Sequence, residues 1–390
     1  MLVSKPIRLL QAERILLIKL REIGDLLLTT PAVKAVRSAY PKSYLAILVN
    51  SGTEDVVRGN PDLDDVIVFE RGWKTLPLLK RLRREGTFLA QVRKRRFDVV
   101  FDFTGGDRAS LLALVSGAGV RVSYDLNRGF WGKQFLYTHQ VRWGVQAKHM
   151  VEHSLDLVRP FVPEPDRYAP FMPCAQEDRE RVAARLEEDG AGGDRLRVHI
   201  HPTSKWFFKC WRDEAVAEVI DYLAGGLGAR VVVTSGPASR EVEKASRIVS
   251  LCRHRPLNWS GCTTLKELAA LSAACHLFVG VDTGPMHIAA AMGTPVVALF
   301  GPSGEHQWGP WGEGHTVVAQ PFPCRPCGQD GCYGSKRSEC LEMIPAFEVK
   351  RAIDHVLLKR GFKLRAASSP GSFRKEEFAV PQRSPVEGIG

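Results

Sequence analysis

Short apolar runs, each bounded by polar or turn-forming residues, recur along the whole chain and alternate with helix-like segments. They lie at residues 14–19 (RILLIK), 45–49, 65–69, 98–103, 197–200, 230–234, 277–281 and 296–300. Runs this short and this continuously apolar are typical of parallel strands that helices cover on both faces. The alternation therefore predicts an α/β fold built from two successive doubly wound units.

Domain boundaries follow from the length of the chain and from one proline-rich segment. The chain has 390 residues, more than one hydrophobic core usually supports. Five prolines fall between Pro160 and Pro173, a composition suited to a stiff linker. We predict two Rossmann-like domains facing across a cleft, then a C-terminal helix and a disordered tail, at residues 1–165, 175–345, 346–362 and 366–390.

The cellular compartment is predicted from the apolar runs and the cysteines. No uncharged apolar run reaches the roughly eighteen residues that a membrane span needs. Near the N-terminus, charges at Arg8, Glu13, Arg14 and Lys19 interrupt the apolar core of any secretion signal. The nine cysteines are an odd number, which favours reduced thiols over a disulfide framework. These features predict a cytoplasmic protein.

Positive charge is concentrated in one segment. The formal net charge is +11, and residues 71–96 hold ten Lys or Arg against one acid, Glu85. Nucleic acid, acidic lipid head groups or a phosphorylated saccharide would each fit such a charge, and so would a merely solvated helix face. Leucines interleave with the bases, so the segment is also predicted to form amphipathic helices with a basic side.

The first segment with candidate chemistry is Arg21-Glu22-Ile23-Gly24-Asp25, where the first predicted strand gives way to a helix. The Asp25 carboxylate could take a proton from an acceptor hydroxyl, or it could cap a helix that begins at Leu26. Only one glycine stands in this turn, so the dinucleotide-binding pattern G-x-G-x-x-G is missing. This counts against a dehydrogenase.

The second segment follows the strand at residues 197–200. Thr203 and Ser204 can donate hydrogen bonds to diphosphate oxygens, and Lys209 can neutralise charge on a leaving group. Ordinary loop residues would have a similar composition, so this segment alone does not decide between the two interpretations.

The third segment, residues 279–287, is a strand that ends in a Gly-containing turn and opens a helix. Free backbone N–H groups at such a helix start form a phosphate site. Asp282 can accept hydrogen bonds from sugar hydroxyls, whereas His287 taken alone is more typical of a structural histidine.

These three segments together resemble the lipopolysaccharide heptosyltransferases, the glycosyltransferase family 9 enzymes that add heptose from ADP-heptose. The family pattern opens with a strand, Gly-Asp and a T-x-P-A helix, as at Gly24-Asp25 and residues 29–32. It continues with a hydroxyl cluster and a lysine before tryptophan, as at residues 201–211. It ends in the D-T/S-G/A-x-x-H turn, as at residues 282–287. The resemblance spans residues 14–360.

The resemblance implies a GT-B fold and an inverting glycosyltransferase that needs no metal or other cofactor. Residues 208–211 and 234–237 are most similar to the third heptosyltransferase group. The implied partners are ADP-heptose as donor, a phosphorylated lipopolysaccharide core as acceptor and an anionic membrane surface, with no nucleic acid. The implied location is cytoplasmic and peripheral at the inner face of the cytoplasmic membrane.

The family pattern also assigns roles to residues of this chain. It implies Asp25 as the general base, with Lys209, Thr203 and Ser204 on the donor phosphates. Asp282 would hold the heptose hydroxyls, and the donor pocket would be completed by Thr283, Gly284, Pro285 and His287. Family members often place a glutamate after the second domain's Gly-rich turn to bind the donor ribose. Here residues 237–240 precede Glu241, so the sequence leaves that contact open.

A cysteine cluster and two rival functions remain. Only one C-x-x-C pair occurs among Cys324, Cys327, Cys332 and Cys340, and the later gaps are unequal, so a structural metal is weakly indicated and unliganded thiols are favoured. A catalytically silent protein that binds sugar nucleotides or polyanions could keep the same cleft. A family member could also use another nucleotide sugar, because the residues that select heptose cannot be identified from the sequence.

Overall fold

The structure is a computed structural model that describes residues 2, 7, 9, 12–126, 129–144, 148–162, 168–193 and 195–362. The predicted tail at 366–390 and residues 163–167 of the predicted linker lie outside the described residues. The first half of the chain forms a sheet of six parallel strands in the order β3-β2-β1-β4-β5-β6. Its strands are β1 (Arg14–Lys19), β2 (Tyr44–Asn50), β3 (Asp65–Phe69), β4 (Val99–Asp102), β5 (Val120–Tyr124) and β6 (His139–Val141).

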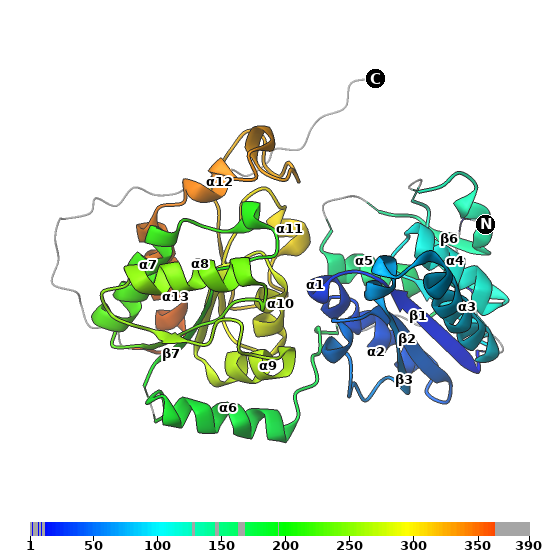
Figure 1. Cartoon of the computed structure of the whole chain (residues 1–390), viewed down its shortest axis with the longest axis horizontal. Coiled ribbons are helices and arrows are strands. Elements are labelled where there is room, and N and C mark those ends of the chain that lie inside the picture. The colour runs from blue at the N-terminus through cyan, green and yellow to red at the C-terminus, as the bar shows by residue number, and fades with distance from the viewer. Residues whose placement is uncertain are drawn as a thin grey trace.

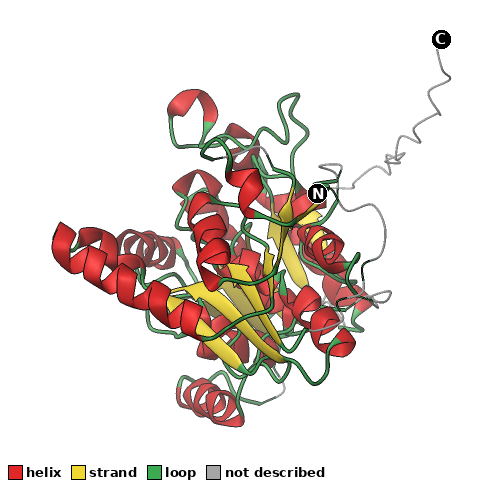
Figure 2. Cartoon of the chain, turned by 90° about the vertical axis from the view of Figure 1, so that its right-hand side faces the viewer, coloured by secondary structure: helices red, strands yellow, loops and turns green. Residues whose placement is uncertain are grey.

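Helices cover both faces of this first sheet (Figures 1 and 2). The α-helices are α1 (Ile23–Leu27), α2 (Thr30–Ala39), α3 (Leu78–Lys94), α4 (Asp107–Ser116) and α5 (Met150–Val158). Short 3-10 turns are η1 (Glu54–Val56), η2 (Arg71–Thr75) and η3 (Lys133–Leu136).

The second half repeats the plan with the strand order β12-β11-β10-β7-β8-β9. Its strands are β7 (Arg197–His201), β8 (Arg230–Val233), β9 (Leu257–Asn258), β10 (Leu277–Val281), β11 (Val296–Leu299) and β12 (Thr316–Val318). Its α-helices are α6 (Gln176–Glu188), α7 (Asp213–Asp221), α8 (Ser239–Leu251), α9 (Leu265–Ala274), α10 (Gly284–Ala291), α11 (Glu305–Trp308), α12 (Glu339–Glu342) and α13 (Ala346–Lys359).

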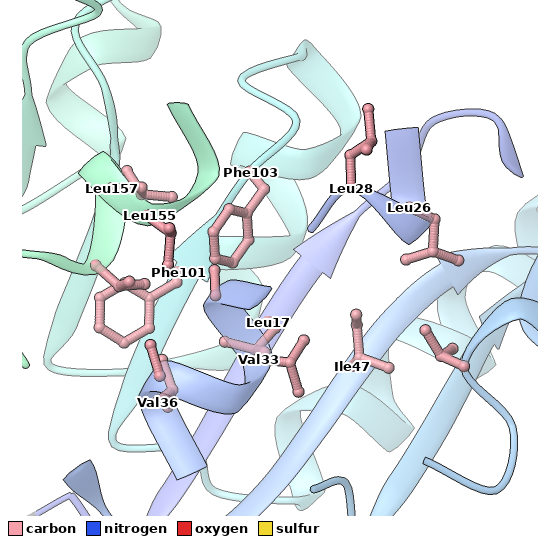
Figure 3. Close-up of a cluster of buried hydrophobic side chains, with 14 of the residues drawn as sticks. Leu17, Leu26, Leu28, Val33, Val36, Ile47, Phe101, Phe103, Leu155 and Leu157 are labelled. Carbon is pink, nitrogen blue, oxygen red and sulfur yellow. The ribbon is translucent and has the colours of Figure 1, made fainter. Parts of the chain in front are cut away.

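Alternate side chains of each central strand enter opposite cores. In β1, Leu17 belongs to a cluster with Val33 of α2 and Leu155 of α5 (Figure 3). Its neighbour Ile18 belongs to the cluster on the other face, with Phe88 of α3. Leu17 and Ile18 are fully buried, and burying a side chain of this size stabilises the fold by about 2 kcal/mol. Such two-sided burial explains why the strands are continuously apolar, and the predicted fold of two Rossmann-like units is confirmed.

The two domains meet where α1 of the first faces α10 of the second (Figure 1). A Cβ atom at Gly24 would lie 2.7 Å from His287 Cδ2, so only glycine allows this approach. Around it, Lys205 Nζ lies 3.3 Å from Glu22 Oε1 and His149 Nε2 lies 2.9 Å from the carbonyl oxygen of Gly309. The carboxyl edges of both sheets therefore open onto one interface, which is where doubly wound sheets bind ligands.

No helix among the described residues is long and apolar enough to cross a membrane.

Candidate active site

Asp25 lies in the first turn of α1, directly beyond β1. The helix begins at Ile23 and its N-cap residue is Glu22, so the alternative that Asp25 caps a helix starting at Leu26 is wrong. The Asp25 side chain is 23% exposed, and its Oδ1 lies 3.9 Å from Lys19 Nζ. This is the one ion pair of the Asp25 carboxylate among the described residues, and no hydrogen bond to it is found there. A carboxylate held this loosely and open to solvent is free to meet an acceptor hydroxyl.

Lys19 is a site residue that the sequence analysis did not identify. It ends β1, is 3% exposed, and donates from Nζ to the carbonyl oxygen of Phe103 at 3.2 Å. Burial lowers the pKa of Lys19, and the nearby Asp25 carboxylate opposes that change. The available signal was a lysine that ends an otherwise apolar strand, since a buried cation needs a partner.

Lys209 and Asp282 form an ion pair across two neighbouring strands. Lys209 ends the 3-10 turn η4 (Phe207–Lys209) after β7, and Asp282 directly follows β10, the strand paired with β7. Lys209 Nζ lies 2.6 Å from Asp282 Oδ2, with the side chains 23% and 8% exposed. The fold thus brings together two predicted donor-binding residues that lie far apart in the sequence.

The two predicted hydroxyl donors differ in their surroundings. Thr203 is fully buried and its Oγ1 donates to Glu241 Oε2 at 2.9 Å, so its hydrogen is already used. Ser204 Oγ accepts from the backbone N–H of Trp206 at 3.2 Å, and its own hydrogen has no protein acceptor among the described residues. Ser204 is therefore the hydroxyl that this arrangement leaves available to a phosphate. The contact with Thr203 also places Glu241, whose role the sequence left open, beside this segment.

The start of α10 carries the remaining predicted residues. Thr283 is the N-cap, Gly284 is the first helical residue and Pro285 follows it. Thr283 Oγ1 and His287 Nδ1 are buried and have no hydrogen-bond partner among the described residues. Burial lowers the pKa of His287 to about 4, so the ring is neutral at pH 7. Unpaired polar groups beside free helix N–H groups form a site that an anionic ligand could satisfy.

A cavity of about 470 Å³ opens at the carboxyl edge of the N-terminal sheet. Residues at or just beyond the carboxyl ends of β1, β2 and β4 line it. Its charged side chains are four bases and two acids, Arg21, Arg71, Lys74, Arg108, Glu22 and Asp107. Two of these bases lie in the basic segment 71–96 and Arg21 opens the first candidate segment, whereas no sequence signal pointed to Arg108. Only the sheet topology shows that the loops after β1 and β4 are neighbours.

The four predicted loop cysteines, Cys324, Cys327, Cys332 and Cys340, are all free thiols. Burial raises the pKa of Cys340 to about 11, with smaller contributions in the same direction from the other three thiols. Across the described part of the chain, no group of three or more His, Cys, Asp or Glu side chains has a metal-binding arrangement.

Solved structures share this architecture over nearly the whole described chain. A crystal structure of a family 9 glycosyl transferase from Veillonella parvula superposes with a TM-score of 0.76 at 22% identity, covering 90% of this chain and 98% of that one. The structure of an E. coli ADP-heptose lps heptosyltransferase II superposes with a TM-score of 0.72 at 19% identity. The match covers 90% of this chain and 100% of that one. The structure of E. coli heptosyltransferase WaaC with ADP superposes with a TM-score of 0.69 at 21% identity, covering 88% of this chain and 99% of that one. The fold is that of GT-B glycosyltransferases.

Sequence comparison gives the family within this class. The model of glycosyltransferase family 9 (heptosyltransferase) matches residues 86–336, and the chain belongs to that family. Lipopolysaccharide heptosyltransferase 3 of Escherichia coli is 28% identical over 339 residues, covering 86% of this chain and 96% of that protein. The lipopolysaccharide heptosyltransferase 3 of Escherichia coli strain K12 is 31% identical over 299 residues, covering 75% of this chain and 84% of that protein. The chain is therefore a glycosyltransferase, as the resemblance implied.

Proposed function

We propose that this enzyme transfers heptose from ADP-heptose to the inner core of lipopolysaccharide, with inversion at the anomeric carbon. The observation that carries the proposal is the packing of Gly24 against His287. It sets Asp25 and the Lys209–Asp282 pair on two sides of one domain interface. The N-terminal domain then holds the acceptor, and the C-terminal domain holds the donor.

In the proposed step, Asp25 removes the proton from an acceptor hydroxyl while that oxygen attacks the anomeric carbon. The bond between this carbon and the diphosphate oxygen breaks through an oxocarbenium-like state, and ADP leaves with the electron pair. Lys209 and the N–H groups at the start of α10 neutralise the charge that develops on the diphosphate. No second carboxylate is needed, because a diphosphate leaves without being protonated, unlike the alcohol in glycoside hydrolysis.

The acceptor assignment rests on the basic cavity of the N-terminal domain. Its four cationic side chains come from the loop beyond β1, from η2 and from the first turn of α4, on the same sheet edge as Asp25. Arg71 is partly neutralised by Glu22 at 3.3 Å. The remaining positive charge suits a phosphorylated saccharide whose hydroxyl reaches Asp25.

The assay that tests this function is ADP release from ADP-heptose, with and without a heptose-deficient lipopolysaccharide core. We expect acceptor-dependent release. A protein that binds ADP-heptose but releases no ADP in the presence of acceptor would be the catalytically silent binder instead.

We expect transfer to persist in EDTA, within about twofold of the untreated rate, because Lys209 and helix N–H groups stabilise the leaving diphosphate. The one Asp-x-Asp triplet in the chain, Asp62–Asp64, offers no metal site at the donor. It precedes β3 at the opposite sheet edge, and its carboxylates pair with Lys34 and Arg37. The measurement is the initial rate of transfer in EDTA and then after the addition of Mg²⁺ or Mn²⁺. Activity that vanishes with EDTA and returns only with a metal would contradict this account.

The basic helix α3 supports a peripheral location of the enzyme at the inner face of the cytoplasmic membrane. Leu78 and Leu79 at its start are 67% and 82% exposed, while its buried residues are Phe88 and Val92. Lys80, Arg83 and Arg84, which stand among the exposed leucines, have no ion-pair partner among the described residues. Exposed apolar side chains beside unpaired bases suit an anionic bilayer. Because α3 follows η2, this surface adjoins the acceptor cavity.

Replacing the four bases Lys80, Arg81, Arg83 and Arg84 by Gln is expected to weaken binding to phosphatidylglycerol vesicles about tenfold or more at low salt. Each surface base near acidic lipid contributes at most about 1 kcal/mol and is screened by salt, so several act together. Binding is measured by vesicle sedimentation, and activity is measured as transfer to membrane-bound acceptor. Both are measured across a series of salt concentrations.

The matched control replaces four exposed bases of the C-terminal domain, Arg230, Arg253, Arg255 and Lys359, by Gln. The net charge change is the same, and binding is expected to stay near that of the wild type. If the α3 variant and the control behave alike, α3 is only a solvated helix face.

A further inference from the structure

A continuous chain of buried hydrogen bonds crosses the C-terminal domain and ends at Glu241. His199 joins Ser272 Oγ through Nδ1 at 3.0 Å and Thr234 Oγ1 through Nε2 at 2.7 Å. His201 joins the same Thr234 hydroxyl through Nδ1 at 2.8 Å. From His201 Nε2 a longer contact of 3.5 Å reaches Thr203 Oγ1, which meets Glu241 at 2.9 Å. The members, all under 9% exposed, are Ser272, His199, Thr234, His201, Thr203 and Glu241.

The donor and acceptor of every hydrogen bond in this series follow from the Glu241 carboxylate at its end. A carboxylate only accepts, so Thr203 donates to Glu241 and its oxygen can only accept from His201 Nε2–H. Burial lowers the pKa of His201 to about 3 and that of His199 well below its usual value, so both rings are neutral. A neutral imidazole has one donor and one acceptor nitrogen. Thr234 therefore donates to His201 Nδ1, accepts from His199 Nε2–H, and Ser272 donates to His199 Nδ1.

Every hydrogen in the chain thus points toward Glu241 and fixes one carboxylate oxygen, Oε2. The other oxygen, Oε1, has no hydrogen-bond partner among the described residues. It lies beneath the turn after β8, where a Cβ atom at Gly236 would come within 2.5 Å of it. β8 is the second strand of its unit and pairs with β7. In doubly wound nucleotide-binding units, an acid beyond the second strand is the group that binds ribose hydroxyls.

We propose that His199, Thr234 and His201 are positioning residues that hold Thr203, and through it Glu241, oriented to accept the ribose hydroxyls of the donor nucleotide. The proposal rests on the proposed donor site in the C-terminal domain. It gives two histidines at the centre of the sheet a role in selecting the nucleotide, beyond filling the core.

The test compares the affinities for ADP and for 2′-deoxy-ADP, by calorimetry, in the wild type and in Thr234→Val. We expect the wild type to bind ADP roughly tenfold or more tightly than 2′-deoxy-ADP, since a hydrogen bond to a carboxylate is a strong one. In Thr234→Val this ratio should fall to about two or below. The matched control is Thr294→Val, which removes a buried hydroxyl that donates to the Ser272 carbonyl at 2.6 Å. This hydroxyl is not a member of the series of hydrogen bonds that ends at Glu241. It should keep the wild-type ratio.

A second pair of variants keeps the test decisive if Thr234→Val does not fold. His201→Gln retains an N–H near the position of Nε2 and should keep most of the discrimination, whereas His201→Leu should lose it. An unchanged ratio in Thr234→Val and in His201→Leu, or a wild type that binds both nucleotides equally, would overturn this proposal alone. A wild type that binds no ADP would overturn the proposed donor site as well.

Discussion

The Asp25→Asn variant is expected to lose transfer activity by about a thousandfold while keeping its fold and its affinity for the donor. A positioned general base contributes about 10²–10⁴ to rate, and an amide cannot take the proton. The fold should tolerate the change, because Asp25 is not the N-cap of α1. The buried Lys19 loses its ion pair of 3.9 Å but keeps its hydrogen bond to the Phe103 carbonyl and the charge of the nearby Asp102. The turnover number, the thermal midpoint and the dissociation constant for ADP together measure the effect.

The control for Asp25→Asn is Asp62→Asn. Asp62 is likewise a carboxylate of the N-terminal domain paired with a lysine, Lys34 at 3.1 Å, but it lies at the opposite sheet edge. Its substitution should leave turnover within about twofold. Near-normal turnover in Asp25→Asn, at unchanged stability, would remove Asp25 as the base.

The Lys209→Met variant is expected to lower kcat/KM by about 10²–10³, with much of the loss in kcat. Removing one preorganised group that stabilises a developing negative charge typically costs this much. The substitution also leaves Asp282, 8% exposed, without its cation, so stability should fall as well. Steady-state kinetics with ADP-heptose, set beside thermal unfolding, separates the two effects.

Two further variants isolate the catalytic part of the Lys209 effect. The double variant Lys209→Met/Asp282→Asn should recover stability without recovering kcat/KM. Lys244→Met breaks another buried Lys–Asp pair in the same domain, with Asp213, and should lower stability while leaving kcat/KM within a fewfold. If Lys209→Met and Lys244→Met lose activity to the same extent, Lys209 serves only the fold.

The central strands could be predicted from the sequence because burial on both faces makes them continuously apolar. β1 and β10 begin and end at the predicted residues. The edge strands β6, β9 and β12, with three, two and three residues, were missed because so short an element has little pattern of its own. The inner strand β5 was also missed, because Arg121 and Ser123 interrupt its apolar run. Helix α7 ends at Asp221, and a π-type turn, Tyr222–Gly226, follows it and ends in two glycines, which favour a departure from regular helix.

The candidate site could be predicted only in part, and for a physical reason. Each predicted residue follows a strand, which a sequence can show. Which strands are neighbours is a property of the sheet, so the pairing of Lys209 with Asp282 and that of Thr203 with Glu241 could not be seen. Lys19 was hidden for the same reason, because its partners lie on α1 and beyond β4.

The most direct measurement of the central claim is a donor competition on one acceptor. The enzyme is given a heptose-deficient lipopolysaccharide core with equal amounts of ADP-heptose, ADP-glucose and UDP-glucose, and the product is identified by intact mass. Wild type is expected to add a single heptosyl unit and to release ADP alone, and Asp25→Asn is expected to add nothing. A hexosyl product, or release of UDP, would show that the enzyme uses another nucleotide sugar and would contradict the proposed function.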